Sequence, residues 1–221
     1  MMNAATKKTT ATDRVYLELR KRILDGALAE GSPIRQDDIA AELGVSKIPV
    51  REALMRLQSE GLVSFTPNAG ATVTVLTVAD YVEMLDMRIA IECRALELAV
   101  PNMAASDIAH ARALLDAYHA AITEEGWSEL NARFHECLYA PANRPRLVAL
   151  IKSVQDQMGK IMRQRVSAVA GHERSHRDHV KILDACERGD VDEAVALLRR
   201  HIEHTQREVQ AYFRRKSAGK A

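Results

Sequence analysis

Residues 43–63 read LGVSKIPVREALMRLQSEGLV, and this stretch decides the fold. Apolar side chains recur in it at the i, i+3, i+4 and i+7 spacing of one helix face: Val50, Ala53, Leu54 and Leu57. Ser46 is a good N-cap residue just before this stripe. Pro49 is tolerated in the first turn because its missing N–H has no helical partner there. The stretch therefore predicts a helix that begins after Ser46 and ends near Gly61.

The segments on either side complete a small domain. Upstream, apolar residues recur at helical spacing over 15–24 and 39–43, with Pro33 breaking the chain between them. Downstream, residues 62–66 and 71–75 alternate around a turn at 67–70, which predicts a β-hairpin. Three short helices and a hairpin form the outline of a winged helix-turn-helix domain, expected over 12–76. Residues 1–11 are expected to form a flexible arm.

The second half of the sequence has helical periodicity and no strand pattern. Thr77 and Asp80 form a capping signature that opens a helix running to about residue 100. The next helix is expected at about 106–125, and Gly126 is expected to end it. Further helices are expected at about 127–139, 144–168, 172–188 and 190–215. Short connections indicate an all-α antiparallel bundle over 77–215, followed by a flexible tail at 216–221. The fold class is thus mainly α.

Composition excludes several classes of protein. The chain has 221 residues, 47% of them hydrophobic, which suits two modest domains rather than a disordered protein. Its net charge of +1 means that any DNA contact depends on local placement of Lys and Arg. The three cysteines are far apart and in no CxxC pattern, which argues against disulfides and a thiolate zinc site. Since we find no signal peptide or long apolar run, we expect a cytoplasmic protein without membrane contact.

The helix after Ser46 has a cationic side opposite its apolar stripe. Lys47 and Arg51 lie there near the N-terminus, where a recognition helix meets base edges and phosphates. Arg51 is suited to donate two hydrogen bonds to a guanine, worth about 1–3 kcal/mol of discrimination. The expected DNA-binding residues are Arg35, Ser46, Lys47, Pro49, Arg51, Arg56, Asn68 and Gly70. The alternative is a surface helix with ordinary solvated cations.

Eight histidines all lie beyond residue 100. Asn131 and His135 are one helical turn apart, and His179 and His201 lie beside apolar residues on the last two helices. Three imidazoles and an amide oxygen gathered in a bundle core suit a divalent metal such as zinc or nickel. Spacing alone leaves three other histidines open as ligands: His172, His176 and His204.

The N-terminal residues resemble the signature of the GntR superfamily of bacterial regulators. The resemblance is carried by residues 43–63, together with 23–26, 31–34 and 70–73. It implies a winged helix that binds double-stranded DNA, at pseudo-palindromic operators, as a homodimer. Ile48 stands where the family usually has Thr, so one hydroxyl donor is expected to be missing from the DNA face.

The C-terminal residues resemble the FCD ligand-binding domain of the FadR-type branch. The segments that carry this resemblance are 88–92, 131–135 with Asn143, 178–183 and 200–201. It implies a metal held by Asn131, His135, His179 and His201, whose shell an effector carboxylate completes. Because Asn131 stands where an acidic ligand is common, the metal is expected to be held less tightly or selected differently.

The resemblance also implies an effector site made by Arg88, Glu92 and Asn143. Arg88 is the best candidate to hold a carboxylate with two hydrogen bonds. The alternative is an Arg88–Glu92 ion pair, four residues apart on a helix surface.

These features predict a regulator of transcription, a repressor, whose operator affinity is controlled by an organic acid or related metabolite. Two other classes stay open at this point. A histidine-bound metal activates water in some enzymes, although we recognise no hydrolase motif that supplies a general base. A winged helix also serves in some proteins as a protein-binding module. We expect a regulator and not an enzyme.

Overall fold

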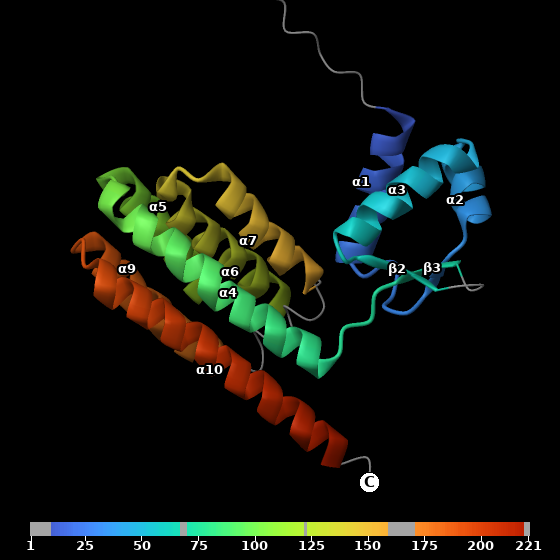
Figure 1. The fold of residues 1–221 in the computed structure, drawn as a ribbon. Helices are drawn as coiled ribbons and strands as arrows, with labels where there is room; N and C mark the ends of the chain where they lie inside the picture. The colour runs from blue at the N-terminus through green and yellow to red at the C-terminus, as the bar shows by residue number, and fades with distance from the viewer. Residues whose placement is uncertain (1–9, 67–69, 122, 159–170, 219–221) are drawn as a thin grey trace, which may run out of the picture. The chain divides into compact units, whose positions relative to one another are not determined.

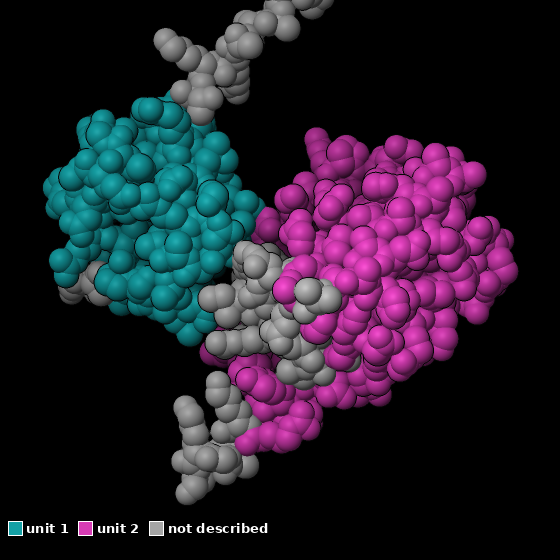
Figure 2. Space-filling view, turned by 180° about the vertical axis from the view of Figure 1, so that it is seen from behind, with its two compact units in different colours: residues 1–75 teal, residues 76–221 magenta. Residues whose placement is uncertain are grey.

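The computed structural model of the chain describes residues 10–66, 70–121, 123–158 and 171–218. The chain divides into two compact units, residues 1–75 (unit 1) and residues 76–221 (unit 2), which Figure 2 shows in different colours. In the described residues, no helix is long and apolar enough to cross a membrane.

In its described residues, unit 1 has three helices and a small antiparallel sheet (Figure 1). The elements are α1 (Ala11–Leu24), β1 (Pro33–Ile34), α2 (Gln36–Leu43), α3 (Lys47–Ser59), β2 (Val63–Thr66) and β3 (Gly70–Val73). The strand order is β1-β3-β2, with Ile34 opposite Ala71 and Val63 opposite Val73. The predicted hairpin is confirmed as β2 and β3, whereas the short strand at Pro33 was not predicted.

The apolar stripe of α3 forms the centre of the unit 1 core. Val50, Ala53, Leu54 and Leu57 are all completely buried, which confirms the predicted inward face. They pack with Val15 and Leu19 of α1, with α2 and with the sheet. Helix α1 begins at Ala11, within the expected arm, because Thr10 and Asp13 form a capping box. Residues 1–9 of that arm lie outside the described residues.

Unit 2 is helical throughout its described residues. Its elements are α4 (Val78–Ala99), η1 (Val100–Asn102), α5 (Ala105–Ala120), α6 (Glu124–Tyr139), η2 (Ala140–Ala142), α7 (Pro145–Gln157), α9 (His172–Glu187) and α10 (Val191–Ala218). Helix α4 lies against α10, α7 and α6, and α9 lies against α10 and α5 (Figure 1). The capping box of Thr77 and Asp80 opens α4 as predicted.

Gly126 lies in the first turn of α6 and does not end a helix, contrary to the prediction. Helix α5 stops at Ala120, and Thr123 then caps α6 by accepting a hydrogen bond from the Gly126 N–H at 3.1 Å. An added Cβ at Gly126 would lie only 3.1 Å from the Thr123 Oγ1, so the glycine leaves room for the cap. The threonine cap therefore decides where this helix starts.

Other boundaries differ less from those expected. Helix α10 continues to Ala218, into the segment expected to be a flexible tail, and residues 219–221 are not described. Helix α7 ends at Gln157, and the rest of the helix expected to residue 168 falls mostly on residues 159–170, which are outside the described part of the chain.

Candidate functional site

The first candidate site is the exposed side of α3 in unit 1. Helix α2 ends at Gly44, whose left-handed backbone (φ 64°, ψ 39°) suits a residue without a Cβ. The chain then turns directly into α3. Ser46 has the extended backbone of an N-cap (φ −74°, ψ 169°), but its hydroxyl makes no capping hydrogen bond. The N-terminal amides of α3 thus lack a side-chain cap from Ser46 and remain available to an anion.

Two cations and two apolar side chains share this side of α3. Lys47 and Arg51 are exposed, and so are Ile48 at 70% and Met55 at 55%. Lys47 lies 2.5 Å from the Asp37 carboxylate, but an ion pair this exposed contributes only about 0–1 kcal/mol and competes weakly with a phosphate. Arg51 has no hydrogen-bond or ion-pair partner among the described residues. The surface offers a free guanidinium beside an apolar side chain.

Arg56 lies on a different side of α3. At about 100° per residue, it is about 140° around the helix from Arg51. Its guanidinium bonds the Asp13 carboxylate at 2.8 Å and lies 4.0 Å from the centre of the Tyr16 ring, both on α1. The structure thus joins Arg56 to α1 within unit 1, and it does not place it beside Arg51 on the cationic side.

The remaining residues expected at DNA lie at element ends. Arg35 is exposed at the N-cap position of α2 and makes no capping hydrogen bond there. Pro49 is half-buried in the first turn of α3. Gly70 opens β3 with a φ of 80° and open space where a Cβ would lie. Asn68 lies outside the described residues.

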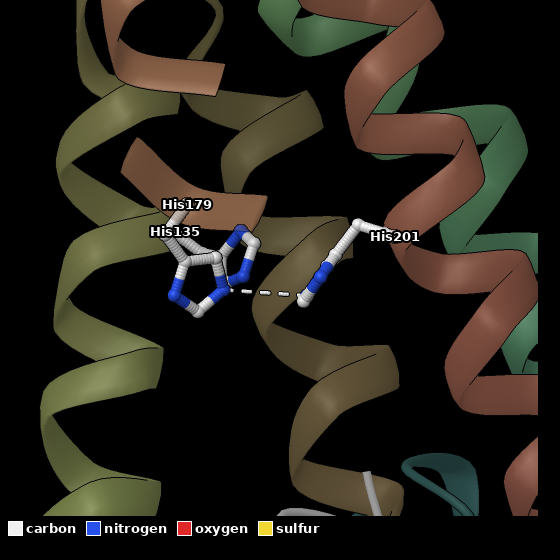
Figure 3. Close-up of side chains that lie close together, drawn as sticks. All are labelled: His135, His179 and His201. Atoms are coloured by element: carbon white, nitrogen blue, oxygen red, sulfur yellow. Dashed lines mark hydrogen bonds between the residues drawn. The ribbon is translucent and has the colours of Figure 1, made fainter. Parts of the chain in front are cut away.

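The second candidate site is a group of three histidines inside unit 2. His135 comes from α6, His179 from α9 and His201 from α10, and Figure 3 shows their rings converging. One nitrogen of each lies within 4.8 Å of the others, and the Nε2 atoms of His179 and His201 are 3.3 Å apart. All three side chains are buried. Asn131 is half-buried one helical turn before His135 on the same helix face.

Burial keeps His135 and His179 in the neutral form that binds metals. Desolvation lowers the pKa of His135 to about 3 and holds the pKa of His179 well below its usual value, with the neighbouring imidazoles adding to the second effect. Both rings are therefore neutral near pH 7. The His135 Nε2 and the His179 Nδ1 are buried with no hydrogen-bond partner. Buried polar atoms rarely stay unpaired, so the His135 Nε2 fits a divalent cation that completes its bonding, whereas His179 faces His201 through its Nε2.

A carboxylate lies behind the third histidine. The Asp178 Oδ2 is 3.5 Å from the His201 Nδ1, and the bond from His201 lowers the pKa of Asp178. A carboxylate on the far nitrogen of a metal-binding imidazole fixes the orientation of its ring. Asp178 was missed in the sequence because its neighbour in space is 23 residues away along the chain.

The other candidate histidines lie outside this cluster, although the His176 Nδ1 is also buried without a hydrogen-bond partner. The His172 Nε2 lies 2.8 Å from the Tyr118 carbonyl oxygen, and its ring stacks on Trp127. His176 stacks on the ring of His119, and the His204 Nε2 lies 3.6 Å from the Glu208 carboxylate. Among the described residues, the three-histidine cluster of His135, His179 and His201 is the group whose nitrogens converge.

Arg88 and Glu92 form an ion pair on α4, but the pair is inside unit 2 and not on its surface. The Arg88 Nε and Nη2 donate to the two Glu92 carboxylate oxygens at 2.6 and 3.2 Å. Glu92 is fully buried and the Arg88 side chain is 12% exposed. Desolvation alone would raise the pKa of Glu92, but the charge and hydrogen bonds of Arg88 hold it below its usual value. Two donors of Arg88 are thus already occupied by the carboxylate of Glu92.

Asn143 has a role in the backbone. It ends η2 with a left-handed conformation (φ 52°, ψ 41°), and its side-chain amide donates to the Pro141 carbonyl at 3.2 Å. Asparagine tolerates this conformation better than most residues. The geometry therefore explains this asparagine by the turn between α6 and α7.

Two family models match the chain. Residues 11–73 match the one described as bacterial regulatory proteins, gntR family, and residues 83–204 match the FCD domain. The HTH-type transcriptional regulator McbR of Escherichia coli is 30% identical over 182 residues, covering 80% of this chain and 82% of McbR. An uncharacterised HTH-type transcriptional regulator of Bacillus subtilis, YdhC, is 27% identical over 196 residues, 86% of each chain.

Solved structures are similar over nearly the whole chain. The structure of Escherichia coli McbR/YncC has a TM-score of 0.74 at 25% identity, covering 92% of this chain and 99% of that one. A putative GntR transcriptional regulator from Rhodococcus sp. RHA1 has a TM-score of 0.75 at 28% identity, covering 90% and 97%.

Proposed function

Because this chain belongs to the gntR family of bacterial regulatory proteins and carries an FCD domain, we propose that it is a metabolite-responsive repressor. It is a DNA-binding transcriptional regulator and not an enzyme. FCD domains typically bind effector metabolites. The proposal adds that the effector is an organic acid, that a divalent metal binds it, and that the regulator acts as a cytoplasmic homodimer on a pseudo-palindromic operator.

The exposed side of α3 supports the DNA half of the proposal. Arg51 is exposed and unpaired among the described residues, and Lys47 gives up only a weak ion pair to reach a phosphate. Arg51 reads a base edge, Lys47 and Arg35 contact phosphates, and the backbone at Gly70 approaches a groove.

One observation carries the sensing half: three buried imidazoles converge, two of them neutral, and the His135 Nε2 among them has no hydrogen-bond partner. His135, His179 and His201 hold the metal, with the Asn131 side chain as a fourth ligand. A bound zinc or nickel ion supplies an open coordination position for a carboxylate. Arg88 lies in the same unit, and its two hydrogen bonds to Glu92 leave three of its five N–H donors, two on Nη1 and one on Nη2, for the effector. Effector binding then changes operator affinity by the difference in its affinity for the DNA-bound and free states.

A gel shift with the promoter of the protein's own operon tests the DNA half. Arg51→Ala is expected to abolish the specific shift, whereas Arg94→Ala removes the same charge from the exposed surface of α4 and is expected to leave it intact. A specific shift that survives Arg51→Ala contradicts the proposed role of α3.

A thermal-shift screen of organic acids, with and without a chelator, tests the sensing half, since a bound ligand raises the melting temperature by mass action. His201→Gln and His204→Gln form a matched pair one turn apart on α10. We expect His201→Gln to lose the metal-dependent shift while retaining DNA binding, and His204→Gln to keep both. Equal responses from the two variants contradict the metal site.

A further inference from the structure

A continuous chain of buried hydrogen bonds runs from Arg88 to the three-histidine cluster. Arg88 bonds Glu92, the Tyr139 hydroxyl lies 2.8 Å from the Glu92 Oε2, and the same hydroxyl lies 3.1 Å from the His135 Nδ1. Gln155 donates to the other Glu92 oxygen at 3.2 Å. Glu92, Tyr139 and His135 are each at most 1% exposed, so water does not supply alternative partners.

The protons along this chain have one consistent arrangement. Glu92 is ionised beside Arg88, so both of its oxygens only accept hydrogen bonds. Tyr139 is a phenol with a single hydroxyl proton, and its oxygen lies at hydrogen-bond distance from the Glu92 carboxylate. A hydroxyl has one proton to donate, and at 2.8 Å the Glu92 oxygen receives it. The Tyr139 oxygen can then only accept from the His135 Nδ1.

This arrangement determines the tautomer of His135. A neutral imidazole has one N–H, and the hydrogen bond to Tyr139 requires it on Nδ1. The Nε2 atom must then carry the lone pair. This is the nitrogen of His135 that is buried without a hydrogen-bond partner. The proton count therefore gives a lone pair to the nitrogen that has no partner in the protein.

We propose that Tyr139, anchored by Glu92 and Arg88, is a positioning residue that holds His135 as the Nδ1–H tautomer with its Nε2 lone pair free for a cation. The tautomer assignment stands on the protein alone, whereas its use in metal binding rests on the proposed function. The Arg88–Glu92 pair thereby orients Tyr139 and, through it, His135, in addition to being a candidate effector contact.

The neighbouring ligand supports this interpretation. The His201 Nδ1 faces the Asp178 carboxylate at 3.5 Å, and its Nε2 faces the cluster. Two of the three imidazoles therefore have a hydrogen-bond acceptor on Nδ1, one supplied by a carboxylate directly and one by a carboxylate through Tyr139. Groups that orient metal-bound imidazoles in this way typically change metal affinity about 10–100-fold when removed.

Tyr139→Phe tests the proposal, because it removes only the hydroxyl oxygen. The matched control is Tyr81→Phe, which deletes the hydroxyl of an equally buried tyrosine on α4 that donates to the Met158 carbonyl. Full-length chains with ¹⁵N-labelled histidine are treated with a chelator, and long-range ¹H–¹⁵N spectra report the tautomer of each ring. Zinc affinity is then measured by competition with a chelating dye.

We expect His135 to be the Nδ1–H tautomer in the wild type and in Tyr81→Phe, and to become a mixture or the Nε2–H form in Tyr139→Phe. Zinc affinity is expected to fall about 10–100-fold in Tyr139→Phe alone. An Nε2–H tautomer in the wild type, or an unchanged tautomer and unchanged zinc affinity in Tyr139→Phe, overturns the proposal. If the tautomer changes as expected and neither the wild type nor any variant binds zinc or nickel, the positioning role is supported and the proposed metal function is wrong.

Discussion

Removing the guanidinium of Arg88 is the sharpest test of how unit 2 is held together. In Arg88→Met the side chain keeps much of its apolar volume, but the fully buried Glu92 loses a partner that bonds both of its oxygens at 2.6 and 3.2 Å. Breaking a buried ion pair by removing one partner costs about 3–5 kcal/mol. Since Tyr139 and Gln155 still donate to Glu92, we expect a loss near the lower end, about 3 kcal/mol. That is a large share of the roughly 5–15 kcal/mol that stabilises a typical domain.

The loss is expected to depend on pH in a direction that identifies its cause. In the wild type the folded-state pKa of Glu92 is lowered, so its stabilisation is present above the unfolded pKa of about 4.3 and is lost as pH falls through the folded pKa. Without Arg88, burial dominates and raises that pKa, so ionisation opposes folding. Protonation then relieves the penalty, and the variant should lose less stability at pH 5 than at pH 8.

Trp127 provides the assay, because it is the single tryptophan of the chain and lies on α6 in unit 2. Urea unfolding followed by its fluorescence, in the presence of a chelator, reports the stability of this unit without linkage to metal binding. The double variant Arg88→Met/Glu92→Gln should recover more than half of the loss, since the amide oxygen still accepts from Tyr139 but carries no charge. Arg94→Met, in an exposed pair with Glu97, should change stability by less than about 1 kcal/mol. A loss below about 1 kcal/mol for Arg88→Met, or one that grows as pH falls, would refute this reasoning.

Three further predictions concern other parts of the chain. Ile48 is 70% exposed beside Arg51, and we expect this apolar side chain to contact a thymine methyl group of the operator. Replacing operator thymines by deoxyuridine should therefore lower the operator affinity of the wild type several-fold more than that of Ile48→Thr in gel shifts. Equal losses of affinity would contradict this role. Arg56→Ala removes a cation over the Tyr16 ring, an interaction worth about 0.5–1 kcal/mol, and should lower the melting temperature of unit 1 in calorimetry. Operator affinity should stay within about threefold of the wild type. A larger loss of affinity would show that Arg56 contacts DNA. Burial raises the pKa of Cys186 to about 12, so Ellman's reagent at pH 8 should label this thiol only as fast as the folded protein opens. The labelled site is mapped by mass spectrometry. Labelling of Cys186 at the rate of a free thiol would show that this side chain is exposed.

Local patterns in the sequence predicted the parts of the fold that depend on near neighbours. The stripe of α3 from Val50 to Leu57 and the cap at Thr77 involve residues within one or two helical turns, so spacing alone identifies them. The two-residue strand at Pro33 was missed because its pairing partner, Thr72, is far along the chain. Gly126 was misinterpreted because Thr123, three residues before it, caps the start of a helix. A glycine that follows such a cap lies in the first turn of the helix and does not mark a helix end.

In the candidate site, too, contacts between near neighbours along the chain could be predicted, whereas contacts between distant helices could not. Histidines on the last helices pointed to a cluster, but spacing left His172, His176 and His204 equally open. The resemblance to the FCD domain selected His135, His179 and His201, and the packing of three helices brings these three together. Asp178 and Tyr139 were not singled out, although Tyr139 lies four residues after His135 and hence on the same helix face. A search for hydroxyl or carboxyl groups one turn from each candidate ligand would have found Tyr139.

Each unit opens with the same device, a threonine and an aspartate three residues apart that satisfy the first free amides of a helix: Thr10 with Asp13, and Thr77 with Asp80. The second pair begins just two residues after Val75, the last residue of unit 1. Each half of the chain thus has its own helix-start signal and its own apolar core. A gene exchange that joins coding segments near this point would transfer unit 1 or unit 2 as a whole. We therefore expect functional chimeras between relatives to be made most easily at this boundary.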